Sequence, residues 1–413
     1  MRRNSWPLPE SDQYVLKSTP SAGRAIFARK PIKLGTHLLS TTDGCKQQAP
    51  SPTAHVVLRP YRREVCSQCF SYDRGREWKY RLGDAGVVFC SETCQKQWED
   101  DCGPLGVAAY VAVESAIKQQ LRRRGNGQLA SGGSLGASED ARGRPPTTNE
   151  AIISAWQTAG LVGDQIAAAR TNEKPSKANR RILRTAEEGT ADHDVLAYIL
   201  AAVLSAYKRS TTKGTMAGQD NATQTQGTPD IPGAQMVSDL FPEMMTLADD
   251  PAVYATNSSL PEYISAYYLL LAVLPTEFLR FLRPALCHEI ASRASHNAFS
   301  IRPAANSDGE QSGEFLGWGI WPEASFFNHS CRPNVKKERL GRVWVFTVAD
   351  GGGGGGGGES GGEDVKEGEE LCITYLGGDE RDLDVHARRK KLKDEWGFDC
   401  RCQRCEEDLR NLA

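Results

Sequence analysis

The sequence predicts an α+β protein whose small sheets are completed by segments from both ends of the chain. Strand and turn patterns occupy residues 14–60 and 295–384, while alanine-rich helical spacing dominates 150–207. The 12 cysteines are clustered rather than spread evenly. With 413 residues, the chain is long enough for two or three structural units, or for one domain with large insertions.

Composition excludes several classes of protein. The apolar content of 39% is sufficient for a core, and 50 basic against 52 acidic residues leave a net charge of −2. This balance gives no global reason to expect nucleic acid or a membrane surface as partner. The most apolar runs, 195–207 and 263–274, fall short of the roughly 18 residues that a membrane span needs. No apolar signal segment opens the sequence, so we interpret clustered cysteines as metal ligands rather than disulfides.

The first part of the chain is expected to alternate short strands with a cysteine module. Residues 25–28 and His37–Ser40 have strand-like composition and are separated by a proline-containing turn. The first cysteine cluster occupies 61–102, and a helix is predicted over 103–121. We expect 103–294 to be mainly helical, interrupted by two polar stretches, 122–149 and 209–234, that are predicted to be disordered.

Strand signals return in the last third of the chain. Strands are predicted over 315–320, 335–339, 342–348 and 370–375, and a charged helix over 384–396. The glycine-rich stretch 351–363 holds most of the excess among the 40 glycines, and we interpret it as a flexible loop inserted in a hairpin.

Four cysteines in the first cluster have zinc-ligand spacing. They form two close pairs about 20 residues apart, at Cys66, Cys69, Cys90 and Cys94. A site closed by four thiolates has no open position for an activated water, so a structural zinc is expected. Free core cysteines are the alternative.

The second cluster supplies three ligands at Cys400, Cys402 and Cys405. Zinc prefers four ligands, so a distant residue must complete this site. The pattern alone leaves open whether a distant histidine does so, or one of three cysteines: Cys287, Cys331 or Cys372.

Two more motifs carry polar residues at strand ends. Residues 328–334 read Asn-His-Ser-Cys-Arg-Pro-Asn after an apolar run, and 367–375 read Glu-Gly-Glu-Glu-Leu-Cys-Ile-Thr-Tyr. Taken singly, the first is typical of a tight turn and the second of a surface hairpin.

In combination and in this order, the motifs resemble those of SET-domain protein-lysine methyltransferases. Residues 23–28, Gly-Arg-Ala-Ile-Phe-Ala, are similar to the first glycine-rich SET motif, and the inserted cysteine module resembles a MYND zinc module. The resemblance, over 14–102 and 285–405, is to the SET-and-MYND family. It implies a SET β-fold split by a zinc module (61–102) and a helical insert (103–294), followed by a post-SET zinc segment (385–413).

The resemblance also implies a site that binds S-adenosylmethionine. Tyr375 would be the catalytic tyrosine and would also contact the cofactor, and Cys331 would be the fourth ligand of the second zinc site. Trp396 stands where relatives often have a second tyrosine, so with Tyr375 it would line the lysine channel. The other implied cofactor-binding residues are Gly23, Arg24, Asn297, Asn328, His329 and Phe398.

One departure from the family concerns the metal count. The middle cysteine pair of a full MYND module is absent between Cys69 and Cys90, so we expect two zinc ions per chain and no ligand role for Cys102. The implied partners are a lysine-bearing protein substrate, from histones or other proteins, and a protein partner at the zinc module. Nucleic acid and membranes are not expected partners. The implied compartment is the nucleus, the cytoplasm or both, and the alternative function is an inactive scaffold for protein–protein interaction.

Overall fold

The computed structural model describes residues 11–19, 23–41, 52–124, 148–213, 231–252, 259–303, 314–349 and 364–412. These residues form two compact units. Unit 1 combines the described parts of 1–52, 302–315 and 321–413, and unit 2 combines those of 53–301 and 316–320. The glycine-rich stretch 351–363, Cys45 and most of 122–149 and 209–234 lie outside the described residues.

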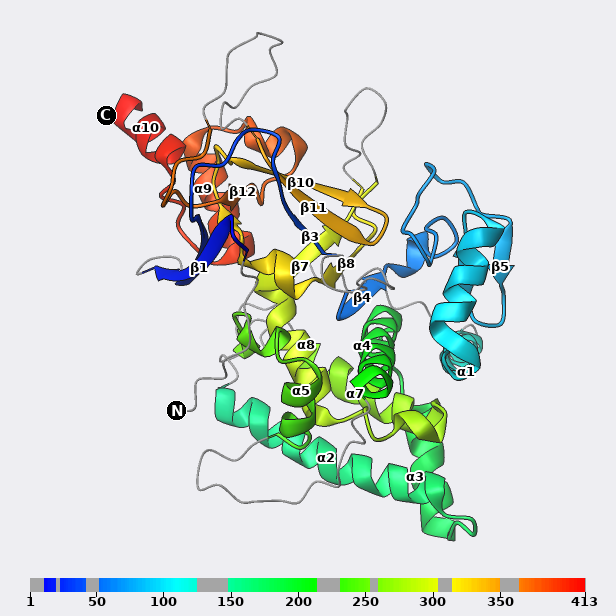
Figure 1. Ribbon diagram of the computed structural model, residues 1–413. Coiled ribbons are helices and arrows are strands. Elements are labelled where there is room, and N and C mark those ends of the chain that lie inside the picture. Colours follow the sequence, from blue (N-terminus) through cyan, green and yellow to red (C-terminus); the bar gives the residue numbers. More distant parts are fainter. Residues whose placement is uncertain are drawn as a thin grey trace. The chain divides into compact units, whose positions relative to one another are not determined.

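Unit 1 is built from small sheets that join the two ends of the chain (Figure 1). Strands β1 (Tyr14–Thr19) and β2 (Gly23–Ala28) form an antiparallel pair. Strand β3 (His37–Ser40) pairs with β11 (Val343–Val348), which forms a hairpin with β10 (Val335–Leu340). These strands confirm the strand predictions on both sides of the helical middle.

A short parallel pair, β9 (Asn328–His329) and β12 (Cys372–Ile373), brings the two remaining motifs together. The strand predicted over 370–375 is therefore shorter than expected, although Glu370 also bridges Phe27. The reason is local. The backbone N–H of Tyr375 donates to the side chain of His329 at 2.9 Å instead of continuing the ladder.

The end of unit 1 is helical and is capped at both boundaries. Helix α9 (Val385–Trp396) begins after Asp384, whose carboxylate accepts from two backbone N–H groups. It ends at Gly397, which has a φ of 76° that favours glycine. Helix α10 (Gln403–Leu412) follows, and the two helices pack against each other.

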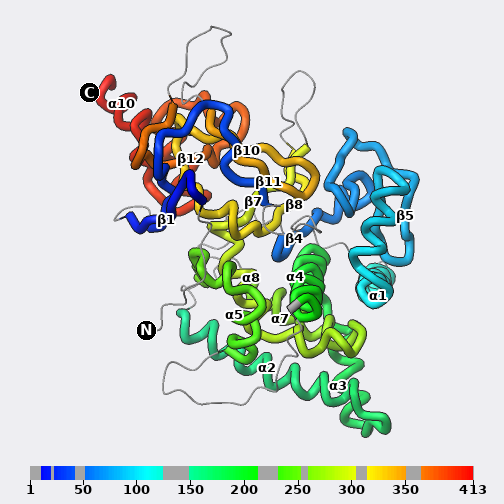
Figure 2. The backbone as a smooth tube through the Cα atoms, viewed as in Figure 1, coloured from blue at the N-terminus to red at the C-terminus, as the bar shows by residue number. Residues whose placement is uncertain are grey.

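Unit 2 is mainly helical and contains a three-stranded sheet and a two-stranded hairpin. The sheet has the order β4 (Ala54–Val57), β8 (Gly317–Ile320), β7 (Ala298–Ile301), and helix α4 packs on β4. Figure 2 traces the bundle of helices α2, α4, α7 and α8. The elements of this unit outside the sheet are β5 (Tyr80–Leu82), β6 (Val87–Phe89), α1 (Glu92–Arg124), α2 (Asn149–Thr171), α3 (Lys177–Glu188), α4 (His193–Lys213), α5 (Ala234–Leu240), α7 (Ser259–Val273) and α8 (Pro284–Asn297).

Helix α1 contains the helix predicted over 103–121 as its second part. It already begins at Glu92 and is interrupted at Gly103, which has a φ of 63° and precedes Pro104. The predicted helix is the second segment after this kink. Short 3-10 helices complete the two units at Arg59–Tyr61, Met244–Thr246, Thr276–Phe278, Pro322–Phe326 and Gly378–Arg381. Among the described helices, none has the length and apolar character required to cross a membrane.

A glycine in strand β8 gives a test of the unit 2 sheet. A Cβ added at Gly317 would lie 2.0 Å from the carbonyl oxygen of Val56 on the paired strand. We expect Gly317→Ala to lower the free energy of unfolding by about 2 kcal/mol or more, because backbone atoms cannot yield cheaply. Urea denaturation checks this, with Gly83→Ala as control, since no atom lies within 4 Å of a Cβ there. Equal stability of the two variants would contradict the strand pairing.

Candidate functional site

The first zinc site forms between a tight loop and the start of helix α1 in unit 2. The N–H of Phe70 donates to the carbonyl of Cys66 at 2.9 Å, which closes the loop that presents Cys66 and Cys69. Cys90 follows strand β6, and Cys94 lies in the first turn of α1. The sulfur atoms of these four residues all lie within 4.8 Å of one another.

These are the four cysteines that the sequence predicts as ligands of the first zinc. Cys102 packs against the apolar cluster around Phe89 and Trp98 and is not one of the four clustered thiols. Asp101 accepts a hydrogen bond from Gln68 at 3.0 Å. Four converging thiols form a closed tetrahedral set, which suits a structural zinc.

The second zinc site lies in unit 1. Its geometry shows which distant cysteine lies beside the C-terminal triplet. The sulfur atoms of Cys331, Cys400, Cys402 and Cys405 lie within 4.8 Å of one another. The other two candidates lie elsewhere, because Cys287 is buried in α8 of unit 2 and Cys372 is in strand β12. Among the three candidate cysteines, Cys331 is therefore the one that lies with the triplet, which agrees with the ligand role that the resemblance implied.

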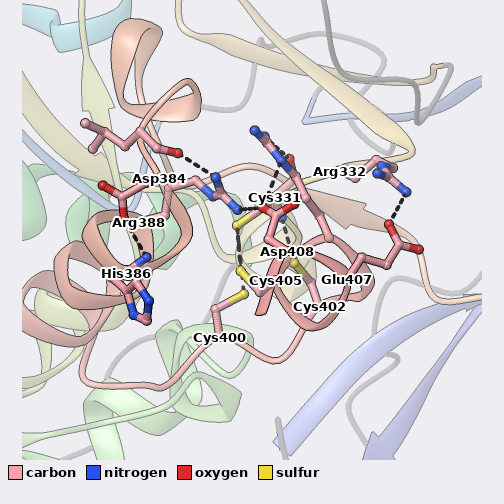
Figure 3. A network of polar contacts seen from close by, with 12 residues as sticks. Cys331, Arg332, Asp384, His386, Arg388, Cys400, Cys402, Cys405, Glu407 and Asp408 are labelled. Carbon is pink, nitrogen blue, oxygen red and sulfur yellow. Dashed lines mark hydrogen bonds and ion pairs between the residues drawn. The ribbon is translucent and has the colours of Figure 1, made fainter. Parts of the chain in front are cut away.

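Zinc binds thiolates, and the contacts around this second site lower the pKa of two of its cysteines, Cys402 and Cys405, while they raise that of Cys331 and Cys400 (Figure 3). The N–H of Cys331 lies 3.4 Å from the Cys402 sulfur and donates to it. Hydrogen bonds from Cys331 and Cys400 lower the pKa of Cys405 to about 7.

An aromatic wall packs directly against the second zinc site. Tyr375, Trp396 and Phe398 contact the apolar cluster that contains Cys331, Cys400 and Cys405. The rings of Tyr375 and Trp396 have centroids 4.6 Å apart, and His329 lies 5.4 Å from Tyr375 and 6.0 Å from Phe398. Four residues predicted to line the cofactor or the lysine channel thus lie together.

The hydroxyl of Tyr375 is fixed inside this wall. It donates to the carbonyl oxygen of Phe327 at 2.9 Å. Burial raises the pKa of Tyr375, with further contributions from Cys372 and Glu370. The hydroxyl therefore stays neutral and keeps its oxygen available as an acceptor.

His329 links the tyrosine to the zinc site. Its Nδ1 accepts the backbone N–H of Tyr375 at 2.9 Å, and its Nε2 lies 3.3 Å from the sulfur of Cys331. Burial lowers the pKa of His329 to about 4, so the ring is neutral. Because Nδ1 is an acceptor, Nε2 carries the hydrogen and donates to the sulfur. Both ring nitrogens are thus engaged, which leaves the ring face and the backbone of His329 for a ligand.

The remaining predicted cofactor residues of unit 1 line its strands. Asn328 donates from its amide to the carboxylate of Glu370 at 2.9 Å. Gly23 has a φ of 70°, and no atom lies within 4 Å of where its Cβ would be, so its backbone is open to a ligand. Arg24 lies over the ring of Phe326 at 5.2 Å, and burial lowers its pKa.

Asn297 belongs to unit 2. It is the last residue of helix α8 and is buried. Its amide nitrogen donates to the carbonyls of Ala248 at 2.7 Å and Arg293 at 2.8 Å. These bonds fix the helix end, and its predicted cofactor role remains a prediction.

Three residues of the site were missed by the sequence reasoning. Phe327 supplies the carbonyl that holds the Tyr375 hydroxyl, and Glu370 holds Asn328. Arg388 is buried beside the second zinc site, although its helix reads as charged and exposed. Helical spacing could have predicted the burial of Arg388, because Arg388 lies on the same helix face as the buried residues Val385 and Leu392.

Comparison with known proteins gives a consistent set of relatives. No family model matches the chain. It is 23% identical to "Potential protein lysine methyltransferase SET6" of Saccharomyces cerevisiae, over 97% of this chain and 96% of that protein. It is 29% identical to "Histone-lysine N-methyltransferase ASHR2" of Arabidopsis thaliana over 39% of this chain and 37% of that protein. It is 35% identical to "Protein-lysine N-trimethyltransferase SMYD5" of Mus musculus over 22% of this chain and 20% of that protein.

The small interleaved sheets, the two four-cysteine sites and these relatives define a zinc-containing SET-domain protein. Its relatives are SET-domain and SET-and-MYND proteins, and the chain is a protein-lysine methyltransferase that uses S-adenosylmethionine. The site fits that cofactor, since aromatic faces suit its adenine and its sulfonium, and the Glu370 carboxylate suits its positive charge.

The metal assignment predicts two zinc ions per wild-type chain. Cys331→Ser should reduce this to about one, because the three remaining thiols cannot complete a tetrahedral site. Metal analysis of the purified proteins by mass spectrometry checks the count. Three zinc ions in the wild type, or two in the variant, would contradict the assignment.

Proposed function

We propose that Tyr375 is the catalytic residue of this protein-lysine N-methyltransferase and that its substrates are lysines of histone or non-histone proteins. The observation that supports this most is the Tyr375 hydroxyl, which is neutral, held by the Phe327 carbonyl and surrounded by an aromatic wall.

The cofactor would be held by residues of unit 1. Gly23 offers its backbone, Asn328 offers its amide, and Phe398 offers a ring face to the adenine. Arg24 and His329 would contribute further contacts, and the family resemblance also assigns a cofactor contact to Asn297. When bound, S-adenosylmethionine supplies a methyl group activated by a positive sulfur, which the lysine amine receives.

The residues of the site would prepare the lysine amine in two ways. A protonated lysine has no lone pair, and its ordinary pKa is about 10.4. The apolar wall around Tyr375 disfavours the charged ammonium and so favours the neutral amine. Because the hydroxyl of Tyr375 donates its hydrogen to Phe327, its oxygen can accept an N–H of the amine and orient the lone pair.

Trp396 would form one wall of the lysine channel. Its ring packs on Tyr375 with 4.6 Å between centroids. It has no hydroxyl, so it restricts the amine by shape, and Tyr375 would supply the orienting hydrogen bond.

Partners beyond the substrate are also proposals. The zinc module at 61–102 would bind a protein partner, and nucleic acid is not a proposed partner. The compartment would be the nucleus, the cytoplasm or both, which imaging of a fluorescent fusion tests.

Replacing the proposed catalytic hydroxyl gives a direct test. Tyr375→Phe should lower methyl transfer to a lysine-peptide array by about 100-fold, because the amine loses its orienting acceptor. Labelled cofactor provides the measurement. Cofactor affinity should change by less than about two-fold, because the ring remains.

Two outcomes would contradict this account. Equal activity of wild type and Tyr375→Phe would exclude the proposed role of the hydroxyl. If the wild type binds cofactor but transfers no methyl group to any peptide, the scaffold function would be favoured instead.

The channel wall can be tested at Trp396. Trp396→Ala should reduce kcat by about ten-fold or more, because the Tyr375 ring loses its packing partner, whereas Trp396→Phe should retain most activity. Steady-state kinetics on the best peptide checks this. Full activity of the alanine variant would exclude Trp396 from the channel.

A further inference from the structure

Arg388 is a buried cation in a helix whose other basic residues are exposed or half-buried. Its side chain is 2% exposed, whereas that of Lys390, two residues later, is 78% exposed. A buried charge is costly unless it is paired and hydrogen-bonded. The surroundings of Arg388 must therefore provide negative charge.

The guanidinium of Arg388 lies between a carboxylate and the thiols of the second zinc site (Figure 3). One terminal nitrogen donates to the carbonyl of Leu383 at 2.5 Å, and the other pairs with Asp408 at 2.5 Å. Figure 3 draws the guanidinium beside the sulfur of Cys331. Desolvation opposes the charge, but Asp408 and the nearby thiols of Cys331 and Cys405 outweigh it and raise the pKa of Arg388.

The zinc centre has an excess of negative charge. Four thiolates around Zn²⁺ leave a net charge of about −2 in a buried site. His329 and the Cys331 N–H donate to sulfur atoms, but both are neutral donors. Arg388 is a cation drawn beside these sulfur atoms (Figure 3), and Arg404 donates instead to the carbonyl oxygen of Cys331. Asp408 is 37% exposed and also lies 3.9 Å from Arg404, so its charge is shared with a second arginine and with solvent.

We propose that Arg388 is a positioning residue of the second zinc site, where its positive charge offsets that of the four thiolates and retains the metal. Groups that contact metal ligands commonly change metal affinity by 10- to 100-fold when they are removed. The inference rests on the zinc site and is independent of the proposed role of Tyr375.

A different account of the same contacts is that Arg388 only clamps helix α9 to helix α10 through Asp408. The two accounts differ in what Asp408 contributes. If Arg388 acts as a clamp, loss of either partner should loosen the site equally. If Arg388 acts by its charge on the thiolates, loss of the Asp408 carboxylate should leave zinc retention unchanged or improved.

The test compares zinc release from four full-length variants with that from the wild type. Arg388→Met removes the charge at similar length, Arg388→Lys keeps the charge, Asp408→Asn breaks the ion pair, and Lys390→Met removes an exposed cation of the same helix. Release to an excess of a chromogenic chelator is followed over time. Zinc release from the first site is an internal control. Cys331→Ser shows which kinetic phase of release belongs to the first site, because that variant retains only this site.

We expect Arg388→Met to accelerate release from the second site by about 10- to 100-fold. Arg388→Lys, Asp408→Asn and Lys390→Met should stay within about three-fold of the wild type, and first-site release should not change. The cobalt-substituted Arg388→Lys protein should keep the wild-type thiolate-to-metal absorption band.

Three results would overturn the proposal. The first is wild-type release from Arg388→Met, and the second is equal acceleration in Arg388→Met and Asp408→Asn, which would favour the clamp. The third is loss of the second zinc from Arg388→Lys, which decides the question even if Arg388→Met does not fold.

Discussion

The convergence of the Cys331 sulfur with the sulfur atoms of three later cysteines, which a shared zinc would bind, is the constraint on which unit 1 depends. Cys331 follows strand β9, and its three companion ligands lie about 70 residues later in the chain. Bringing four thiolates within bonding distance of one ion fixes the C-terminal segment against this strand. That segment carries Trp396 and Phe398, so closing the metal site also places the aromatic wall around Tyr375. His329 adds a direct connection, since one ring nitrogen contacts the Cys331 sulfur and the other holds the backbone of Tyr375.

Much of this site could be predicted from local spacing, because short-range patterns encode short-range contacts. The pairs around Cys66 and Cys90 and the triplet from Cys400 to Cys405 are read directly from the chain. The partner of the triplet is different. Nothing in the spacing of Cys331 distinguishes it from Cys372, since the contact crosses about 70 residues, and the choice required the family resemblance.

The features that the sequence did not reveal depend on tertiary contacts. Arg388 lies in a run of basic residues that is typical of a solvated helix, and only the packing of α9 on the zinc cluster buries it. The strand before Tyr375 ends early because a side chain, His329, takes the N–H that a longer ladder would have used. In both cases the sequence pattern predicted the correct element, a helix in the first and a strand in the second. A contact with a distant residue determined which side chain is buried and where the strand ends.

Hydrogen–deuterium exchange of the Tyr375 backbone tests most directly whether the second zinc organises the site. The comparison is between the wild type and Cys402→Ser, which removes one ligand and leaves the 328–334 motif intact. If zinc, Cys331 and His329 together fix this backbone, the peptide containing Tyr375 should exchange at least about ten-fold faster in the variant, and peptides from strands β7 and β8 of unit 2 should be unchanged. Equal protection of Tyr375 in both proteins, with the second zinc absent from the variant, would contradict the account.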